Sequence, residues 1–453
     1  NHQASLSSGL EPGPALGDTR RMPGEIRLKR HNPSANTLEL AMDEINAGLW
    51  REAAAILEPV AGGQESGNPL PAYAMAYVLT RLNLGDDALK YLKIAALCPP
   101  DVVFPFELEF MDILAWAMKE NPADSRAPFY LGNLLFDLQP EKAVEAWERS
   151  RALDPSFSVV LRNLGLAYAR VKNDLPAAVA SLEKAVAANP KDPRLYYELD
   201  VLSEAAGADP QKRLALLEKN HGVVSGHDDA LSREIRLLVQ TGRSSQALEL
   251  LRGHHFHVWE GGGEIYGLWV EANLLRGREF LDGKHGREAL KDFEAALSYP
   301  ANLEVAAPSR GGGSAKVFFL IALAYELMGR KSESASFTEK AAALEPGWSE
   351  QAYFKGLALS RLGRGSEADA VFSGLVAFAR EKLRSSPAMD FFEKFGERQS
   401  AKAHEAQYHF LAGLGLKGLE KKPEAAEEFR QALALSPDMP ESRRQLAEIA
   451  RER

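Results

Sequence analysis

Apolar and polar positions follow each other along most of the chain with the three-to-four-residue period of α-helices that bury one face. Within this pattern, an alanine followed four positions later by a bulky apolar residue returns at regular intervals. The pairs are Ala53/Leu57, Ala88/Leu92, Ala143/Trp147, Ala178/Leu182, Ala247/Leu251, Ala289/Phe293, Ala368/Phe372 and Ala425/Phe429. The pattern predicts helix pairs in which the alanine lies where two helices cross and the bulky residue packs onto the neighbouring pair.

One unit carries the pattern almost in full, with Leu161, Leu164, Gly165 and Tyr168 in its first helix and Ala178, Leu182, Ala185 and Pro190 in its second. This spacing follows the W-x2-L-G-x2-Y and A-x3-F signatures of the tetratricopeptide unit of about 34 residues. From about Thr37 to its end, the chain resembles tetratricopeptide-repeat proteins. The resemblance implies an all-α, right-handed superhelix (an α-solenoid) of about nine helix pairs. The amphipathic tail Pro440–Arg453 is expected to form a C-terminal capping helix.

Several intervals between the alanines exceed one repeat and predict insertions. The insertions are Pro100–Asp124, His254–Glu264, Pro300–Ser314 and Ser373–Lys402. Two of them are long and apolar enough to add helices of their own, over Phe106–Lys119 and Leu375–Leu383. The interval from Ala178 to Ala247 spans two repeats, so a degenerate unit around Leu214 is expected within it. A further second helix near Ala335 has lost the spacing.

The amino-terminal segment differs from the rest, because it is rich in Pro, Gly and Ser and has no helical period. It predicts an extended strap or linker over residues 1–36, and its start at Asn1 favours a fragment boundary there. We therefore divide the remainder into an N-terminal tetratricopeptide array (37–253), a His/Trp/Gly insertion loop (254–264) and a C-terminal array with its capping helix (265–453).

The insertion loop holds three histidines within four residues, His254, His255 and His257. On an extended backbone His255 and His257 point to one side and Phe256 to the other. Three interpretations remain open: the aromatic residues fill space, with the histidines as packing residues; the loop contacts a ligand or partner through His255, His257, Trp259 and Glu260; or the histidines and Glu260 bind zinc. No zinc-motif spacing is complete, so we assign these four as binding residues and assign no metal site.

The same segment carries a narrower resemblance. Residues 256–262 and 292–303 are similar to the C-terminal repeat half of large bacterial proteins in which a β-rich domain of presumed carbohydrate-related function comes first. The resemblance implies that the chain is a helical accessory half and that His257, Trp259 and Glu260 face the missing domain or its ligand.

A glycine-rich turn, Arg310–Ser314, precedes a helix expected near Ala315. Its backbone N–H groups, with Ser314 as the N-cap, suit an anion, so Arg310 joins the binding residues. The Walker pattern is absent, which leaves nucleotide binding without support. No catalytic motif occurs, and the single cysteine, Cys98, has no histidine near it in sequence. We therefore predict neither a catalytic residue nor a cofactor, and no enzyme in this chain alone.

Composition narrows the class of partner. Apolar residues make up 45% of the 453 residues and charged residues 26%, as in a folded soluble protein, and the net charge of −9 argues against nucleic acid as the main partner. The longest apolar stretch, Val317–Tyr325, is far shorter than the ~20 residues of a membrane span, which favours a cytoplasmic protein. The leading prediction is a non-enzymatic scaffold that binds a peptide or neighbouring domain through its concave groove and insertion loops; homo-oligomers are left open.

Overall fold

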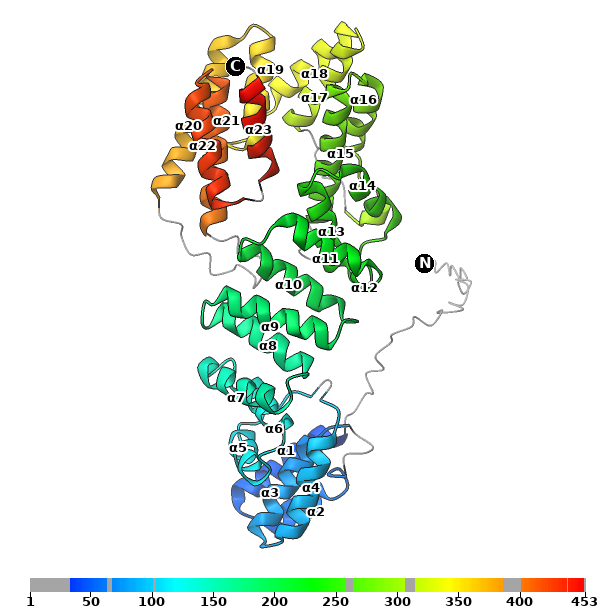
Figure 1. Ribbon diagram of the computed structural model, residues 1–453, viewed down its shortest axis with the longest axis vertical. Helices are drawn as coiled ribbons and strands as arrows, with labels where there is room; N and C mark the ends of the chain where they lie inside the picture. Colours follow the sequence, from blue (N-terminus) through cyan, green and yellow to red (C-terminus); the bar gives the residue numbers. More distant parts are fainter. Residues whose placement is uncertain are drawn as a thin grey trace, which may run out of the picture. The chain divides into compact units, whose positions relative to one another are not determined.

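The regular structure is helical throughout the part of the chain that the computed structural model describes, residues 33–62, 67–100, 103–257, 264–305, 314–385, 401–437 and 439–451. These ranges contain α-helices and one 3-10 turn, η1 (Ala301–Leu303), and no β-strand. Neighbouring helices pack against each other in pairs (Figure 1). The fold is an all-α solenoid of tetratricopeptide-like helix pairs, as predicted. It divides after Leu135 into two compact units.

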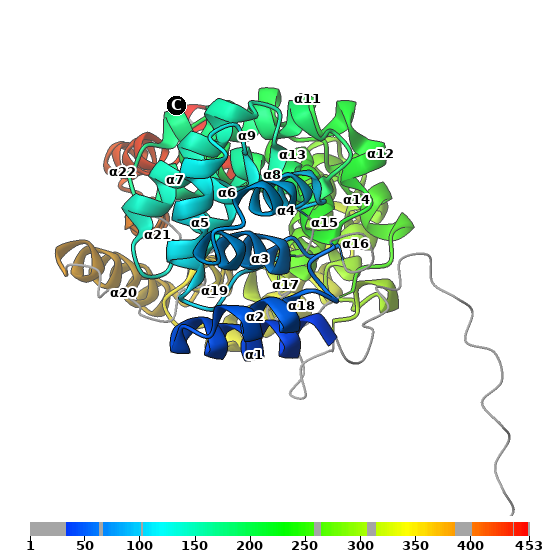
Figure 2. The same cartoon turned by 90° about the horizontal axis from the view of Figure 1, so that it is seen from below.

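Unit 1 consists of three helix pairs. They are α1 (Pro33–Ala47) with α2 (Trp50–Leu57), α3 (Leu70–Arg81) with α4 (Gly85–Leu97), and α5 (Phe110–Glu120) with α6 (Arg126–Leu135). Figure 2 shows the first two pairs (blue) side by side, and α3 contacts both α1 and α2. Tyr73 lies fully buried in α3, where its hydroxyl donates a hydrogen bond to Asp124 Oδ2 over 2.6 Å.

Unit 2 contains the remaining helices. They are α7 (Pro140–Leu153), α8 (Ser158–Arg170), α9 (Leu175–Ala188), α10 (Pro193–Ala205), α11 (Pro210–Lys219), α12 (His221–Val224), α13 (Asp228–Gln240), α14 (Ser244–Gly253), α15 (Glu264–Asp282), α16 (Gly286–Ala295), α17 (Ala315–Leu327), α18 (Lys331–Ala343), α19 (Glu350–Arg361), α20 (Gly365–Arg384), α21 (Ala401–Gly418), α22 (Lys422–Leu435) and α23 (Pro440–Arg451).

The pairs of unit 2 cross where the repeat pattern places small residues. A Cβ built on Gly165 of α8 would lie 2.9 Å from Leu182 Cγ and 3.2 Å from the Ala178 carbonyl of α9. Glycines in α15, α19 and α21 likewise abut a phenylalanine ring of the second helix; the pairs are Gly277/Phe293, Gly356/Phe372 and Gly413/Phe429. The eight alanines that define the pattern are all buried. The close approach of the helices therefore depends on the missing or small side chain.

The structure confirms the degenerate unit as α10 and α11, with Leu214 buried, and the capping helix as α23. Other expectations need correction. The first inserted helix begins at Phe110, not Phe106, since residues 103–106 are not helical and residues 107–109 form the turn that leads into the helix. Ser334, not Ala335, takes the buried position in α18.

Two further boundaries differ from expectation. Leu375–Leu383 is not a separate helix but the second half of α20, since no proline interrupts the run and Gly374 stays helical against the Trp348 ring. Helix α1 already begins at Pro33, within the segment expected to be a linker, and residues 1–32 lie outside the described ranges. The division into arrays at residues 254–264 stays a prediction.

Candidate functional site

The described part of the insertion loop, His254–His257, follows α14 and is fixed on its inner side. Phe256 is only 1% exposed and packs in the core of unit 2 with Leu303 of η1. Its backbone N–H donates to the Asn302 carbonyl over 2.8 Å, and the Asn302 side chain donates to the carbonyls of Leu251 and His254. The loop is thereby joined to the insertion that follows α16.

Asp228, at the start of α13, holds the loop from another direction. Its Oδ1 lies 2.8 Å from His254 Nε2, and its Oδ2 accepts a hydrogen bond of 2.7 Å from the backbone N–H of His257. The backbone is therefore anchored on both sides of His255 and at the N–H of His257.

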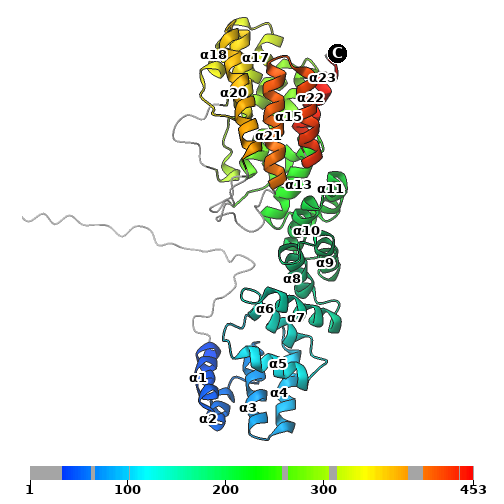
Figure 3. The ribbon, with the colours of Figure 1, turned by 90° about the vertical axis from the view of Figure 1, so that its left-hand side faces the viewer.

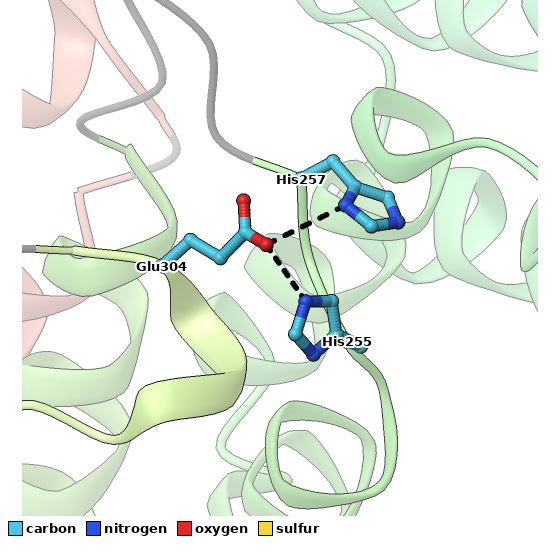
Figure 4. A group of neighbouring side chains, drawn as sticks. All are labelled: His255, His257 and Glu304. Atoms are coloured by element: carbon cyan, nitrogen blue, oxygen red, sulfur yellow. Dashed lines mark hydrogen bonds and ion pairs between the residues drawn. The ribbon is translucent and has the colours of Figure 1, made fainter. Parts of the chain in front are cut away.

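His255 and His257 project together toward Glu304 (Figure 4). Both are exposed whereas Phe256 between them is buried, as an extended backbone predicts. Their ring centroids are 5.0 Å apart. Both rings face the same carboxylate oxygen, Glu304 Oε1, at 2.8 Å from His255 Nε2 and 3.6 Å from His257 Nδ1. All three residues are exposed. The arrangement is a cluster of two imidazoles and one carboxylate, named here the His–His–Glu cluster.

Glu304 was missed by the sequence analysis, which considered Glu260 as the acidic partner. A usable signal existed: the insertions at His254–Glu264 and Pro300–Ser314 follow the second helices of successive pairs, and such loops emerge at the same edge of a solenoid. Trp259, Glu260 and Arg310 lie outside the described residues, so their assignment as binding residues remains a prediction. Ser314 caps α17 as expected, accepting from the Val317 N–H.

A second cluster lies where α23 returns to earlier helices of unit 2. Glu441 of α23 lies 3.4 Å from Arg278 Nη1 of α15 and 3.6 Å from Lys316 Nζ of α17. Lys316 also pairs with Glu350 of α19 at 2.9 Å. Burial alone would raise the pKa of Glu441, but the charges of Lys316, Arg278 and Arg444 outweigh it and lower that pKa to about 2. The carboxylate of Glu441 is thus held in its charged form by three cations.

The far end of α23 is held in the same manner. Lys417 Nζ of α21 donates to Gln445 Oε1 over 2.7 Å and to Glu448 Oε2 over 2.6 Å. Figure 3 shows α23 beside α22, with which it packs, and its Glu441 reaches α15 and α17 through ion pairs. In this part of unit 2, α17 contacts α15 and α19, and α19 contacts α21. We call the shared face of these four helices the first-helix face; α23 packs on α22 and reaches this face through the side chains of Glu441, Gln445 and Glu448.

Charged side chains also join first helices earlier in unit 2. Arg162 of α8 makes a bidentate pair with Glu198 of α10, and Arg236 of α13 pairs with Glu264 of α15. Deeper in the unit, Asp200 of α10 accepts from the guanidinium groups of both Arg213 and Arg233. These pairs join the side chains of neighbouring repeats.

Two further observations bear on the sequence predictions. Burial raises the pKa of the Cys98 thiol, the reverse of what a nucleophilic cysteine requires. Among the described helices, none combines the length and apolar character needed to cross a bilayer.

Comparison with solved structures finds repeat proteins of low similarity. A tetratricopeptide repeat protein from Parabacteroides merdae is 17% identical, with 65% of this chain and 99% of that chain covered and a TM-score of 0.36. YrrB, a TPR protein with an unusual peptide-binding site, is 20% identical, with 41% and 90% covered and a TM-score of 0.32. A structure of Naa15/Naa10 bound to HypK is 13% identical, with 92% of this chain and 66% of that chain covered and a TM-score of 0.35. No family model matches the chain.

Proposed function

We propose that the chain is a non-enzymatic interaction scaffold that binds a peptide or a neighbouring domain through its first helices and its insertion loops. One observation carries the proposal: the first-helix face already contacts a helix of the same chain, α23, through three polar side chains of that helix. A surface that binds one helix by side-chain contacts has the shape and charge to bind another of similar chemistry.

The contacts of α23 indicate what that chemistry is. Glu441, Gln445 and Glu448 lie at i, i+4 and i+7, which places them on one side of the helix. They meet Arg278, Lys316 and Lys417, three cations from three different helices. The preferred partner is therefore a helical segment with acidic residues spaced seven apart.

The contact is also one that a partner can replace. Within the described residues, Ser442 Oγ and Arg444 Nη1 are buried without a hydrogen-bond partner. Burial lowers the pKa of Arg444, although Glu441 opposes this effect. Burying polar groups without full pairing costs free energy, so α23 is held less tightly than an apolar helix of equal area would be.

A peptide with the sequence of α23, Pro440–Arg451, tests this directly in the full chain. Reversing two charges, Glu441→Lys with Glu448→Lys, should release α23 and open the first-helix face. We expect a fluorescently labelled peptide to bind this variant at least ~10-fold more tightly than the unmodified chain, where the tethered helix competes at an effective concentration of about 1 mM. Fluorescence anisotropy measures both affinities.

Glu427→Lys is the matched control, because it reverses an exposed charge on α22 that pairs only with Arg430 and Gln431 among the contacts shown. It should bind the peptide no better than the unmodified chain. A displayed helical-peptide library selected on the double variant should enrich acidic residues seven apart. Equal binding to all three proteins, or selected peptides without that spacing, would refute the proposal.

The narrower resemblance, to a helical accessory half of carbohydrate-related bacterial proteins, stays a prediction. Two of the residues that it assigns to the contact with the missing domain, Trp259 and Glu260, lie outside the described residues. Within the described loop, His257 is 74% exposed, which suits a contact with a further domain.

A further inference from the structure

We infer that the His–His–Glu cluster of His255, His257 and Glu304 is a binding site for a divalent first-row transition-metal ion, with zinc as the representative metal. Its donor atoms are two imidazole nitrogens and one carboxylate oxygen. This is the three-ligand set of zinc sites that leave a fourth position open. Calcium and magnesium prefer oxygen ligands, so the two imidazoles select against them.

The distances between the donor atoms fit this assignment. Bonds of about 2.0–2.1 Å in a tetrahedral site separate ligand atoms by roughly 3.3 Å. The two nitrogen-to-oxygen distances, 2.8 and 3.6 Å, lie on either side of that value. All the ligand atoms lie within 4.8 Å of one another. Small side-chain rotations, with no movement of the backbone, would bring the three atoms to coordination distance of one ion.

The backbone that carries the ligands is arranged in advance. Phe256, between the two histidines, is locked in the core, and the His257 N–H is held by Asp228. On the other insertion, Leu303 is fully buried and Glu304 adopts a left-handed conformation with φ of +49°. Residues other than glycine adopt that conformation at a cost, so the fold keeps Glu304 there against its local preference.

The cluster differs from the other histidine–carboxylate pairs of unit 2. His221 lies 2.9 Å from Glu234, and His409 lies 2.7 Å from Glu428, but each involves one imidazole. Within the described residues, the His–His–Glu cluster alone unites three such side chains at ligand spacing. One carboxylate oxygen here faces two imidazoles. A shared metal ion explains this arrangement, whereas a simple ion pair needs only one imidazole.

The test is titration of the full chain, free of any affinity tag, with Zn²⁺ by calorimetry and with Co²⁺ by visible absorption. We expect one equivalent of each metal per chain and an intense d–d band for Co²⁺. Mg²⁺ and Ca²⁺ should give no saturable heat. The variant His255→Gln with His257→Gln should lose ~100-fold or more in Zn²⁺ affinity, since even an outer-shell change costs about 10–100-fold.

Glu304→Gln removes one ligand charge and should weaken Zn²⁺ binding at least ~10-fold. His221→Gln is the control, because it alters a half-exposed histidine that also pairs with a glutamate. It should bind Zn²⁺ like the unmodified chain. Helical circular dichroism of each variant checks that the fold is retained. Absence of stoichiometric binding, equal affinity in the double histidine variant, or equal binding of Mg²⁺ would overturn the assignment.

Discussion

The cores of the two units differ in the number of charged side chains that they bury. Among the described residues of unit 1, Asp124 is the one charged residue that is buried, and it is satisfied by Tyr73 and by backbone N–H groups. Unit 2 buries several charged residues, among them Asp200, Arg213, Arg233 and Lys316. The surface of unit 1 exposes large apolar side chains, among them Leu97, Phe104 and Phe106.

This difference shows two ways of holding repeats in register. An apolar core stabilises through area removed from water and tolerates small shifts between helices. A buried ion pair tolerates none, because a displaced partner leaves an uncompensated charge in a medium that solvates it poorly. Unit 2 should therefore be the more sensitive to single charge removals and to acid, and unit 1 the more sensitive to loss of packing.

We expect the largest loss of stability from Asp200→Ala, which should affect unit 2 and spare unit 1. It removes the 2% exposed carboxylate that Arg213 and Arg233 share and leaves the two buried guanidinium groups with Glu204, which is partly exposed. Removal of one partner from such a network costs about 3–5 kcal/mol. Hydrogen exchange measured by mass spectrometry should show faster opening of α10, α11 and α13 and unchanged exchange in unit 1. The exposed-pair variant Asp87→Ala in unit 1 is the control and should leave exchange unaltered.

The second largest effect should come from acid, which should weaken the contact of α23 with the rest of unit 2. The folded pKa of Glu441, about 2, lies below the ordinary value of 4.5. Its contribution is therefore complete above pH 4.5 and is lost as the pH falls through 2, which removes up to about 3 kcal/mol. The protection of the α23 amides, taken relative to the intrinsic exchange rate at each pH, should fall over this range. Burial raises the pKa of Asp124, so its contribution in unit 1 instead fades as the pH rises through that raised pKa.

Glu441→Gln isolates this effect from that of Glu271, whose pKa burial raises. At pH 7 the variant should exchange faster than the unmodified chain in α23, and at pH 2 the two should agree. A difference that persists unchanged at pH 2 would show that the charge of Glu441 is not what holds the helix.

Gly165→Leu separates packing from charge within unit 2. The new side chain would collide with Leu182 and the Ala178 carbonyl, and overpacking of this kind costs about 1–3 kcal/mol. Urea unfolding followed by circular dichroism should show the loss as a lower midpoint. Gly85→Ala is the comparison, since no atom lies within 4 Å of a Cβ placed there. An unchanged midpoint for Gly165→Leu would mean that α8 and α9 do not cross at this residue.

The smallest effect should come from Tyr73→Phe in unit 1. It removes the hydroxyl that donates to Asp124 and retains the ring, at a cost of about 1–2 kcal/mol. Because Asp124 still accepts from the Arg126 N–H, the loss should be confined to α3 and the turn before α6. Exchange in α10 and α13 serves as the internal reference. A loss as large as that of Asp200→Ala would remove the distinction between the two units.

The sequence predicted the features that depend on local spacing. The buried alanines and the glycine crossings follow from residues 12 to 17 apart, so their periodicity is visible in the chain itself. The histidines that face Glu304, and the Arg278 and Lys316 that pair with Glu441, are 47 or more residues away from those carboxylates, in loops and helices whose approach depends on how the repeats stack. The placement of Ser334 shows a second limit: a small polar residue can replace alanine at a crossing, and spacing alone cannot tell which neighbour is buried.

Because α23 is made last of the described helices, its contacts with the earlier helices can form only once it has been made. Arg278 leaves the ribosome 163 residues before Glu441, an interval of roughly 8–33 s at about 5–20 residues per second. During that time Arg278 lacks the carboxylate of Glu441, and Lys316, once made, can pair with Glu350 but not with Glu441. A nascent chain halted in this window would present a cationic surface that the finished protein conceals, open to any acidic segment nearby.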